Sequence, residues 1–144
     1  MIKEGDLILL YHDHKHNFLI KAQKNTIHTA KGFFKVEDIM GKEFGQNIET
    51  NLGFKFHILQ PYLYEMIMKV RRQTQIIYPK DIGMILVQSK IFPGATVIEC
   101  GIGSGGLTTA LANFVRPSGR GFSFERKEEF LNNIFNAFIN VIGS

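Results

Sequence analysis

The sequence of 144 residues predicts a mixed α/β protein whose N-terminal part consists of strands. Over residues 1–60, short apolar runs alternate with turn residues, which is typical of antiparallel strands. After residue 95, an apolar run, a glycine cluster and a helix-like segment follow one another. This order is typical of a strand–turn–helix unit in a parallel sheet. We therefore predict a small N-terminal β domain over 1–60, a helical connection over 61–94, and the incomplete N-terminal part of a Rossmann-like domain over 95–144.

The predicted β domain contains two hairpins, because four apolar runs of strand length occur in pairs. The first connection, 12–17, is polar, and the second, Asn51-Leu52-Gly53, has the composition of a turn. Such short strands, bounded by turn residues, predict antiparallel pairing. The paired runs are Leu7–Tyr11 with Phe18–Lys21, and Gln46–Thr50 with Phe54–Leu59.

Three histidines in the first connection have the spacing of a possible metal site. His12, His14 and His16 would share one face if this segment were a strand, and imidazole is a common metal ligand. However, Asp13 and Asn17 are residues that favour turns. The sequence therefore favours a solvated hairpin turn, and we predict no metal site.

The middle and the end of the chain predict helices. Pro61 is expected to start a helix over 62–69, and Pro79 one over 80–91, since proline is tolerated at the first helical positions. A last helix over 127–142 has a broad apolar face. A complete sheet would cover such a face, and an open strand edge invites pairing with another chain. We therefore predict self-association or marginal stability.

The glycine cluster after the apolar run 97–100 predicts a nucleoside cofactor site. Glycines at such a turn allow a sharp bend and close approach of the backbone to a ligand, while the next helix points its N–H groups at that ligand. Gly101, Gly103 and Gly106 fit the spacing of dinucleotide sites, whereas Gly101, Gly103 and Gly105 fit that of S-adenosylmethionine (SAM) sites. Glu99 favours SAM, because its carboxylate would attract the cationic methionine end and repel a diphosphate.

A second strand is predicted over 121–125, and it ends in an acid. A carboxylate at the end of the second strand is what recognition of the ribose hydroxyls requires. Glu125 is therefore the candidate ribose ligand, and the alternative is a solvated residue at the end of a strand.

Several motifs in this order resemble those of the tRNA (adenine-58-N1)-methyltransferases of bacterial or archaeal type. The resemblance covers essentially the whole chain, and the piece around Tyr78-Pro79-Lys80-Asp81 is the most specific to the family. One departure is Phe124, which stands where the family usually has tyrosine. The segments that carry the resemblance are Glu4–Leu10, His28–Gly32, Val36–Lys42, Ile77–Asp81, Phe92–Glu99 and Phe122–Lys127.

The resemblance implies roles for individual residues. Glu125 would accept hydrogen bonds from the ribose hydroxyls, and Phe130 would lie close to the adenosine, although a phenylalanine early in an amphipathic helix is equally expected in a core. The family also implies tRNA as substrate and a homotetramer as assembly. The residues expected to wrap the methionine and ribose with backbone groups are Ser104, Gly105, Gly106 and Leu107.

The resemblance also implies that this chain lacks the catalytic half of the enzyme. Family members continue through the rest of the sheet, which carries an aspartate beside the transferred methyl group, and no residue here corresponds to it. We therefore name no catalytic residue and expect no catalysis from this chain alone. Two alternatives stay open: a non-catalytic remnant that binds SAM or RNA, and a fragment of an NAD-dependent oxidoreductase.

Composition agrees with a cytoplasmic globular protein. The net charge is +4 and the sequence pI about 9.2, which is compatible with RNA. Lys69, Arg71 and Arg72 are candidate phosphate contacts, or cations at the end of a helix. The single cysteine, Cys100, excludes an internal disulfide and is expected to be a small buried residue. We see no signal peptide and no apolar run of about 18 residues that would span a membrane.

Overall fold

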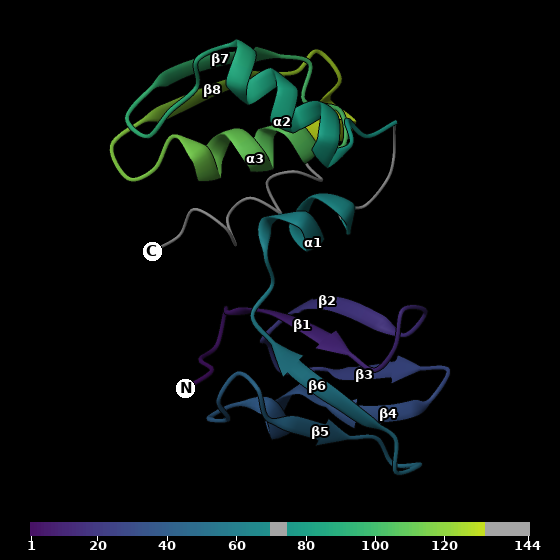
Figure 1. The fold of residues 1–144 in the computed structure, drawn as a ribbon. Helices are drawn as coiled ribbons and strands as arrows, with labels where there is room; N and C mark the ends of the chain where they lie inside the picture. Colours follow the sequence, from purple (N-terminus) through teal and green to yellow (C-terminus); the bar gives the residue numbers. More distant parts are fainter. Residues whose placement is uncertain (70–74, 132–144) are drawn as a thin grey trace. The chain divides into compact units, whose positions relative to one another are not determined.

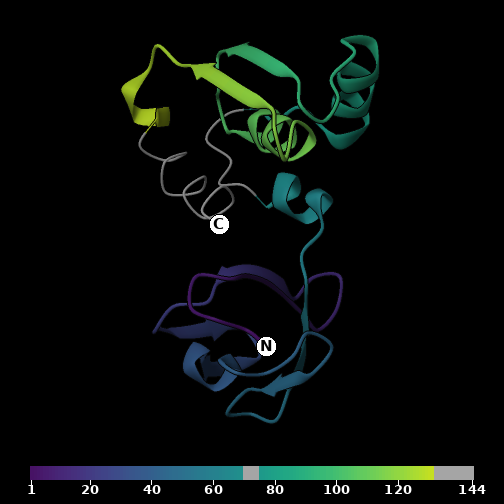
Figure 2. The same ribbon diagram turned by 90° about the vertical axis from the view of Figure 1, so that its left-hand side faces the viewer.

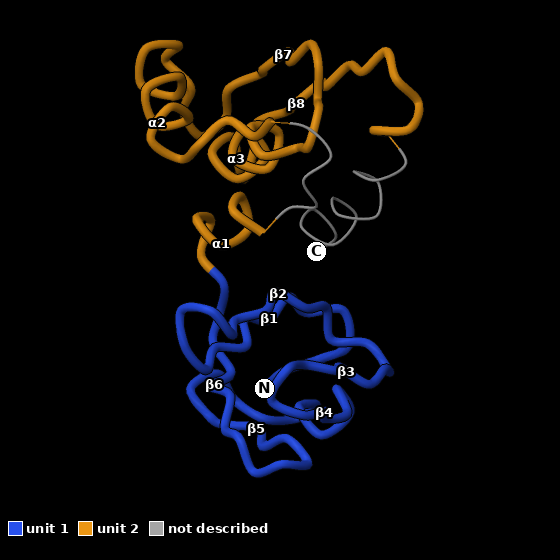
Figure 3. The backbone as a smooth tube through the Cα atoms, turned by 90° about the vertical axis from the view of Figure 1, so that its right-hand side faces the viewer, with its two compact units in different colours: residues 1–61 blue, residues 62–144 orange. Residues whose placement is uncertain are grey.

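The computed structural model describes residues 1–69 and 75–131. The chain divides into two compact units, Met1–Pro61 and Tyr62–Ser144, shown in blue and orange in Figure 3. The elements of both are labelled in Figure 1.

The first unit contains a four-stranded antiparallel sheet with the strand order β2-β1-β6-β5. Its first hairpin pairs β1 (Leu7–Tyr11) with β2 (Asn17–Lys21), and its second pairs β5 (Asn47–Glu49) with β6 (Lys55–Leu59). Both predicted hairpins are therefore confirmed, with strand ends that differ by at most one residue. The pairing of β1 with β6 joins them into one sheet.

A third hairpin, which the sequence analysis did not predict, joins β3 (Thr26–Thr29) to β4 (Gly32–Lys35). Its two turn residues, Ala30 and Lys31, lack the Asn-Gly or Gly-Gly signal of a tight hairpin. A short 3₁₀ helix, Val36–Ile39, follows β4.

The core of the first unit follows from the alternation of side chains along its strands. Ile8 and Leu10 on β1, and Phe56 and Ile58 on β6, are fully buried. Residues two apart on a strand share one face, so each strand contributes one apolar row. Val36 and Ile39 of the 3₁₀ helix complete this core.

The second unit contains a parallel strand pair that is connected through a helix. β7 (Thr96–Cys100) leads through α3 (Gly106–Phe114) into β8 (Arg120–Phe124), and Thr96 pairs with Arg120 and Cys100 with Phe124. In Figures 1 and 2, α3 lies along one face of the pair. This is the strand–turn–helix–strand order that the sequence predicts.

Two earlier helices, α1 (Leu63–Met68) and α2 (Pro79–Gln88), pack against α3. Their shared core contains Ile67 from α1, Ile82 and Leu86 from α2, and Ala110 and Leu111 from α3. The predicted helices exist, but two ends were wrong. Pro61 lies before the N-cap residue Tyr62, and α2 ends before Lys90, which has the left-handed φ of 52° that interrupts a helix.

Only part of the predicted last helix can be compared. The backbone is helical over residues 128–131. Residues 132–142 of that prediction lie outside the described residues.

The face of the β7–β8 pair opposite α3 is apolar and open among the described residues. Ile98, Phe122 and Phe124 lie on it and are 69%, 48% and 59% exposed. Cys100 lies on the same face and is also exposed, so the prediction that it is buried was wrong. A side chain at this position is buried only where a further layer covers the sheet.

This open face gives the predicted self-association a specific location. We expect the chain to associate with increasing concentration in sedimentation velocity, because burial of apolar area is favourable. Replacing Phe122 and Phe124 together by serine should remove most of this association. The matched control is Phe92→Ser, which removes an exposed phenylalanine (53%) outside the strands. Equal association of both variants would show that another surface is responsible.

Candidate cofactor-binding site

The glycine turn follows the carboxyl end of β7, the edge at which open α/β sheets bind ligands. Gly101, Gly103 and Gly105 have φ angles of 91°, 56° and 79°. Side-chain-bearing residues rarely adopt this left-handed region, so the turn needs glycine at all three positions. The three positions are those of the SAM spacing. Gly106, the extra glycine of the dinucleotide spacing, is the first residue of α3 and has ordinary helical backbone.

The turn leads directly into α3, whose N-cap is Gly105. The Gly105 carbonyl accepts hydrogen bonds from the Thr109 N–H (2.9 Å) and from the Thr109 hydroxyl (2.7 Å). The predicted residues Ser104, Gly105, Gly106 and Leu107 therefore form the end of the turn and the first turn of the helix. Free N–H groups at such an end attract acceptor or anionic groups of a ligand.

Glu99 is the most unusual side chain of this site, because it is buried and only partly paired. It is 7% exposed, and its Oε2 accepts a hydrogen bond from the Ser123 hydroxyl at 2.7 Å. Its Oε1 is buried without a partner among the described residues. A buried acceptor without a donor is costly. Glu99 thus carries an acceptor atom, Oε1, that makes no hydrogen bond among the described residues.

Glu125 lies directly after β8 and reaches back to the glycine turn. Its Oε2 accepts hydrogen bonds from the N–H groups of Ile102 (3.0 Å) and Gly103 (3.2 Å), and its Oε1 accepts one from Lys127 (2.9 Å). The N–H groups of Lys127 and Gly103 stabilise the ionised carboxylate and lower the pKa of Glu125. The carboxylate is therefore fixed beside the glycine turn, and its contact with a ribose stays a prediction.

Phe130 lies near the start of the last helical segment and is partly buried. The Lys127 ammonium nitrogen lies 5.3 Å from the centroid of its ring. The described contacts do not connect Phe130 with the glycine turn, so its role beside an adenosine stays a prediction.

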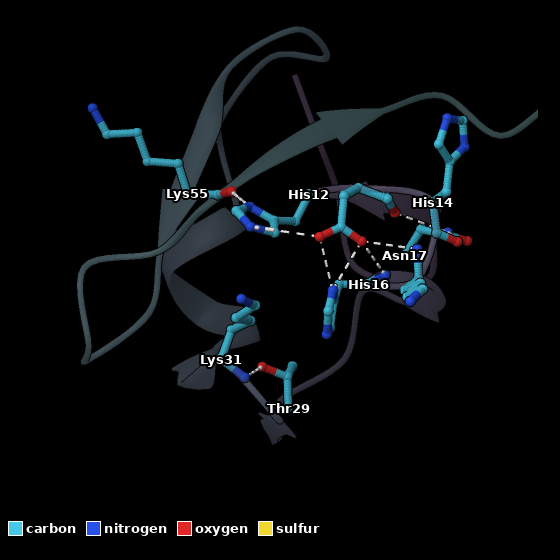
Figure 4. Close-up of polar contacts among 9 residues, drawn as sticks. His12, His14, His16, Asn17, Thr29, Lys31 and Lys55 are labelled. Atoms are coloured by element: carbon cyan, nitrogen blue, oxygen red, sulfur yellow. Dashed lines mark hydrogen bonds and ion pairs between the residues drawn. The ribbon is translucent and has the colours of Figure 1, made fainter.

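The histidine segment forms the predicted turn between β1 and β2 (Figure 4). His16 donates through Nδ1 to the Asp13 carboxylate at 2.8 Å, and this bond lowers the pKa of Asp13 to about 2. His12 donates to the Lys55 carbonyl at 2.7 Å, while His14 points away. His12 and His16 are partly buried, so the turn is less solvated than predicted. Over residues 1–69 and 75–131, no group of side chains could hold a metal ion.

The candidate phosphate contacts fall partly outside the described residues. Lys69 is the C-cap of α1. Arg71 and Arg72 lie in the segment that the structure does not describe. The RNA role of this basic group therefore stays a prediction.

A glycine turn between two parallel strands, with an acid at the end of each strand, is typical of nucleoside-cofactor-binding α/β proteins. Comparison with known families narrows this class. The model of the tRNA methyltransferase complex GCD14 subunit family matches residues 53–140. The chain therefore belongs to this family of tRNA m1A58 methyltransferases, and the nicotinamide alternative loses its support.

Individual relatives agree with this assignment. The chain is 31% identical over 133 residues to a tRNA (adenine(58)-N(1))-methyltransferase catalytic subunit of Dictyostelium discoideum, covering 90% of this chain and 42% of the relative. It is 30% identical over 122 residues to the tRNA (adenine(57)-N(1)/adenine(58)-N(1))-methyltransferase TrmI of Methanocaldococcus jannaschii, covering 85% and 42%. The chain thus spans about two fifths of these curated relatives.

Solved structures confirm the predicted fold. A SAM-dependent O-methyltransferase from Thermotoga maritima matches with a TM-score of 0.83 and 33% identity, over 97% of this chain and 53% of that chain. The tRNA (m1A58) methyltransferase TrmI from Aquifex aeolicus matches with 0.72 and 31%, over 97% and 54%. The fold is therefore an N-terminal antiparallel β region followed by the start of a Rossmann-like methyltransferase domain. No helix in the described parts has the length and apolar character needed to cross a membrane.

Proposed function

We propose that this chain provides the SAM-binding part of a tRNA adenine N1-methyltransferase that acts on position 58. The observation that carries the proposal is the geometry of the turn. Three glycines with left-handed φ angles lie between two carboxylates, and one oxygen of Glu99 is buried with no partner in the part of the chain that the structure describes. This donor and acceptor set matches a ligand with a cationic amino group at one end and a ribose at the other.

Each residue would then have a defined part in holding SAM. Glu99 would accept a hydrogen bond from the amino group through Oε1, and Glu125 would accept one from a ribose hydroxyl. The backbone of Ser104, Gly105, Gly106 and Leu107 would surround the ligand where α3 begins. Phe130 would contact the adenosine. When bound, SAM supplies an activated methyl group, so the protein mainly has to orient the reactants and accept one proton.

The methylated atom would be N1 of an adenine that leaves the base stack of the tRNA. We assign no described residue to the contact with this adenine or to the acceptance of its proton. Assembly as a homo-oligomer and a cytoplasmic location follow from the family resemblance and belong to the same proposal.

Titration calorimetry with S-adenosylhomocysteine tests the proposal, with NAD as the control ligand. We expect saturable binding of S-adenosylhomocysteine, no binding of NAD, and at least tenfold weaker binding by the Glu125→Ala variant, because hydrogen bonds to charged groups are the strong ones. A folded chain that binds neither ligand would contradict the cofactor-site proposal.

The alternative is a non-catalytic protein that binds SAM or RNA. Methyl transfer to an unmodified tRNA transcript, with and without a supplied C-terminal half of a relative, separates the two. Activity only in the reconstituted mixture would support an incomplete enzyme, whereas SAM binding without activity in either case would support the non-catalytic protein.

A further inference from the structure

Glu125, the proposed ribose ligand, also accepts hydrogen bonds from the backbone of the glycine turn. Ile102 and Gly103 each direct an N–H group to Oε2 of this carboxylate, at 3.0 and 3.2 Å. The contacts join residues that are 22 and 23 positions apart in the sequence. They therefore connect the end of β8 to the turn that follows β7.

Two backbone hydrogen bonds hold the turn near its ends, and the bonds to Glu125 add to them at Ile102 and Gly103. Gly101 donates its N–H to the Phe124 carbonyl (2.8 Å), and Gly105 donates to the Ile102 carbonyl (3.0 Å). Between them, Ile102 is buried, with 8% exposure. A buried N–H group without an acceptor is rare in folded proteins, since it forgoes its hydrogen bond to water. In the described structure, the Glu125 carboxylate accepts the hydrogen bond from the Ile102 N–H group.

We propose that Glu125 is a positioning residue that holds the glycine turn in its ligand-binding conformation before any ligand is present. The carboxylate has about four accepting positions, and the N–H groups of Ile102, Gly103 and Lys127 use three of them. Under the proposed function, the same carboxylate would also accept a ribose hydroxyl. One side chain thus both shapes the turn and contacts the ligand. Loss of Glu125 therefore changes the conformation of the turn even when no ribose is bound.

Hydrogen exchange in the absence of ligand tests the positioning role directly. The amide exchange rates of Ile102 and Gly103 are measured by NMR for the full chain, for Glu125→Ala and for Glu125→Gln. We expect at least tenfold faster exchange of both amides in Glu125→Ala, and a smaller increase in Glu125→Gln, whose amide oxygen keeps one acceptor. The control is Glu128→Ala, which removes the same charge from an exposed residue nearby. Unchanged exchange in Glu125→Ala would overturn the proposal.

A second experiment, which rests on the proposed function, compares two ligands to separate the positioning role of Glu125 from its contact with the ribose. S-adenosylhomocysteine is compared with its 2′,3′-dideoxy analogue, which lacks the hydroxyls that Glu125 would bind. A residue that only contacts ribose leaves the affinity for the analogue unchanged when it is replaced. We expect Glu125→Ala to weaken binding of the analogue at least fivefold as well. Faster exchange without binding of either ligand would leave the positioning role intact and refute the cofactor assignment.

Discussion

Replacing Gly119 by alanine should lower the free energy of unfolding of the second unit by about 3 kcal/mol. Gly119 lies between α3 and β8, where the backbone passes close to two other segments. A Cβ atom there would lie 2.5 Å from the Ala95 carbonyl oxygen and in hard contact with the Val115 carbonyl oxygen. Both neighbours are backbone atoms that also accept hydrogen bonds, from Arg120 (3.0 Å) and Gly119 (2.8 Å). The clash is therefore relieved only by moving α3 or β7.

Gly121→Ala is the matched control for this prediction. Gly121 is two residues further along the chain and lies within β8. An added Cβ atom there would meet nothing within 4 Å. Measured by urea unfolding, the free energies of unfolding of the two variants should therefore differ by most of the predicted loss. If Gly119→Ala and Gly121→Ala unfold at the same urea concentration, the result would contradict the close approach of the backbones at residue 119.

Replacing Glu99 by glutamine should weaken binding of S-adenosylhomocysteine by about 1.5–3 kcal/mol, which corresponds to roughly 10- to 100-fold. The glutamine oxygen can still accept the Ser123 hydroxyl, but the charge that attracts an ammonium group is lost. Stability should be unchanged or higher, because the variant removes a buried charged group that is only partly paired.

Weaker binding of S-adenosylhomocysteine without a loss of stability is a result that only a ligand site predicts. A purely structural Glu99 would lose stability on substitution and would change affinity only through that loss. Calorimetry and urea unfolding of the same preparation measure both quantities, and Glu128→Gln provides the control for removal of a negative charge. A clear loss of stability with unchanged affinity would assign Glu99 to the fold alone.

The local parts of the site could be predicted from the sequence, because they depend on residues that are close in the chain. The spacing of Gly101, Gly103 and Gly105 predicts a turn that requires left-handed backbone, and all three adopt it. An acid at the end of each predicted strand likewise follows from the pattern alone. Glu99 and Glu125 are found at those strand ends.

The partners of these acids could not be predicted, because they depend on how distant segments meet. Nothing in the sequence indicates that Glu125 accepts hydrogen bonds from the N–H groups of Ile102 and Gly103, or that one oxygen of Glu99 has no donor within 1–69 and 75–131. The exposure of Cys100 was mispredicted for a similar reason. Burial on a strand depends on whether another layer covers that face, and the residue's own neighbours carry no such information.

The short sequence span of the candidate site has a consequence for the order of folding. Every contact between the turn and the two strands lies within residues 96–127, and the bond from Glu125 to Ile102 closes a segment of 23 residues. The entropy lost on closing a loop grows only slowly with its length, and short segments close early. The ligand-binding elements can therefore form before more distant strands pair. A ligand present at that time would stabilise the first folded elements and favour the rest of folding around them.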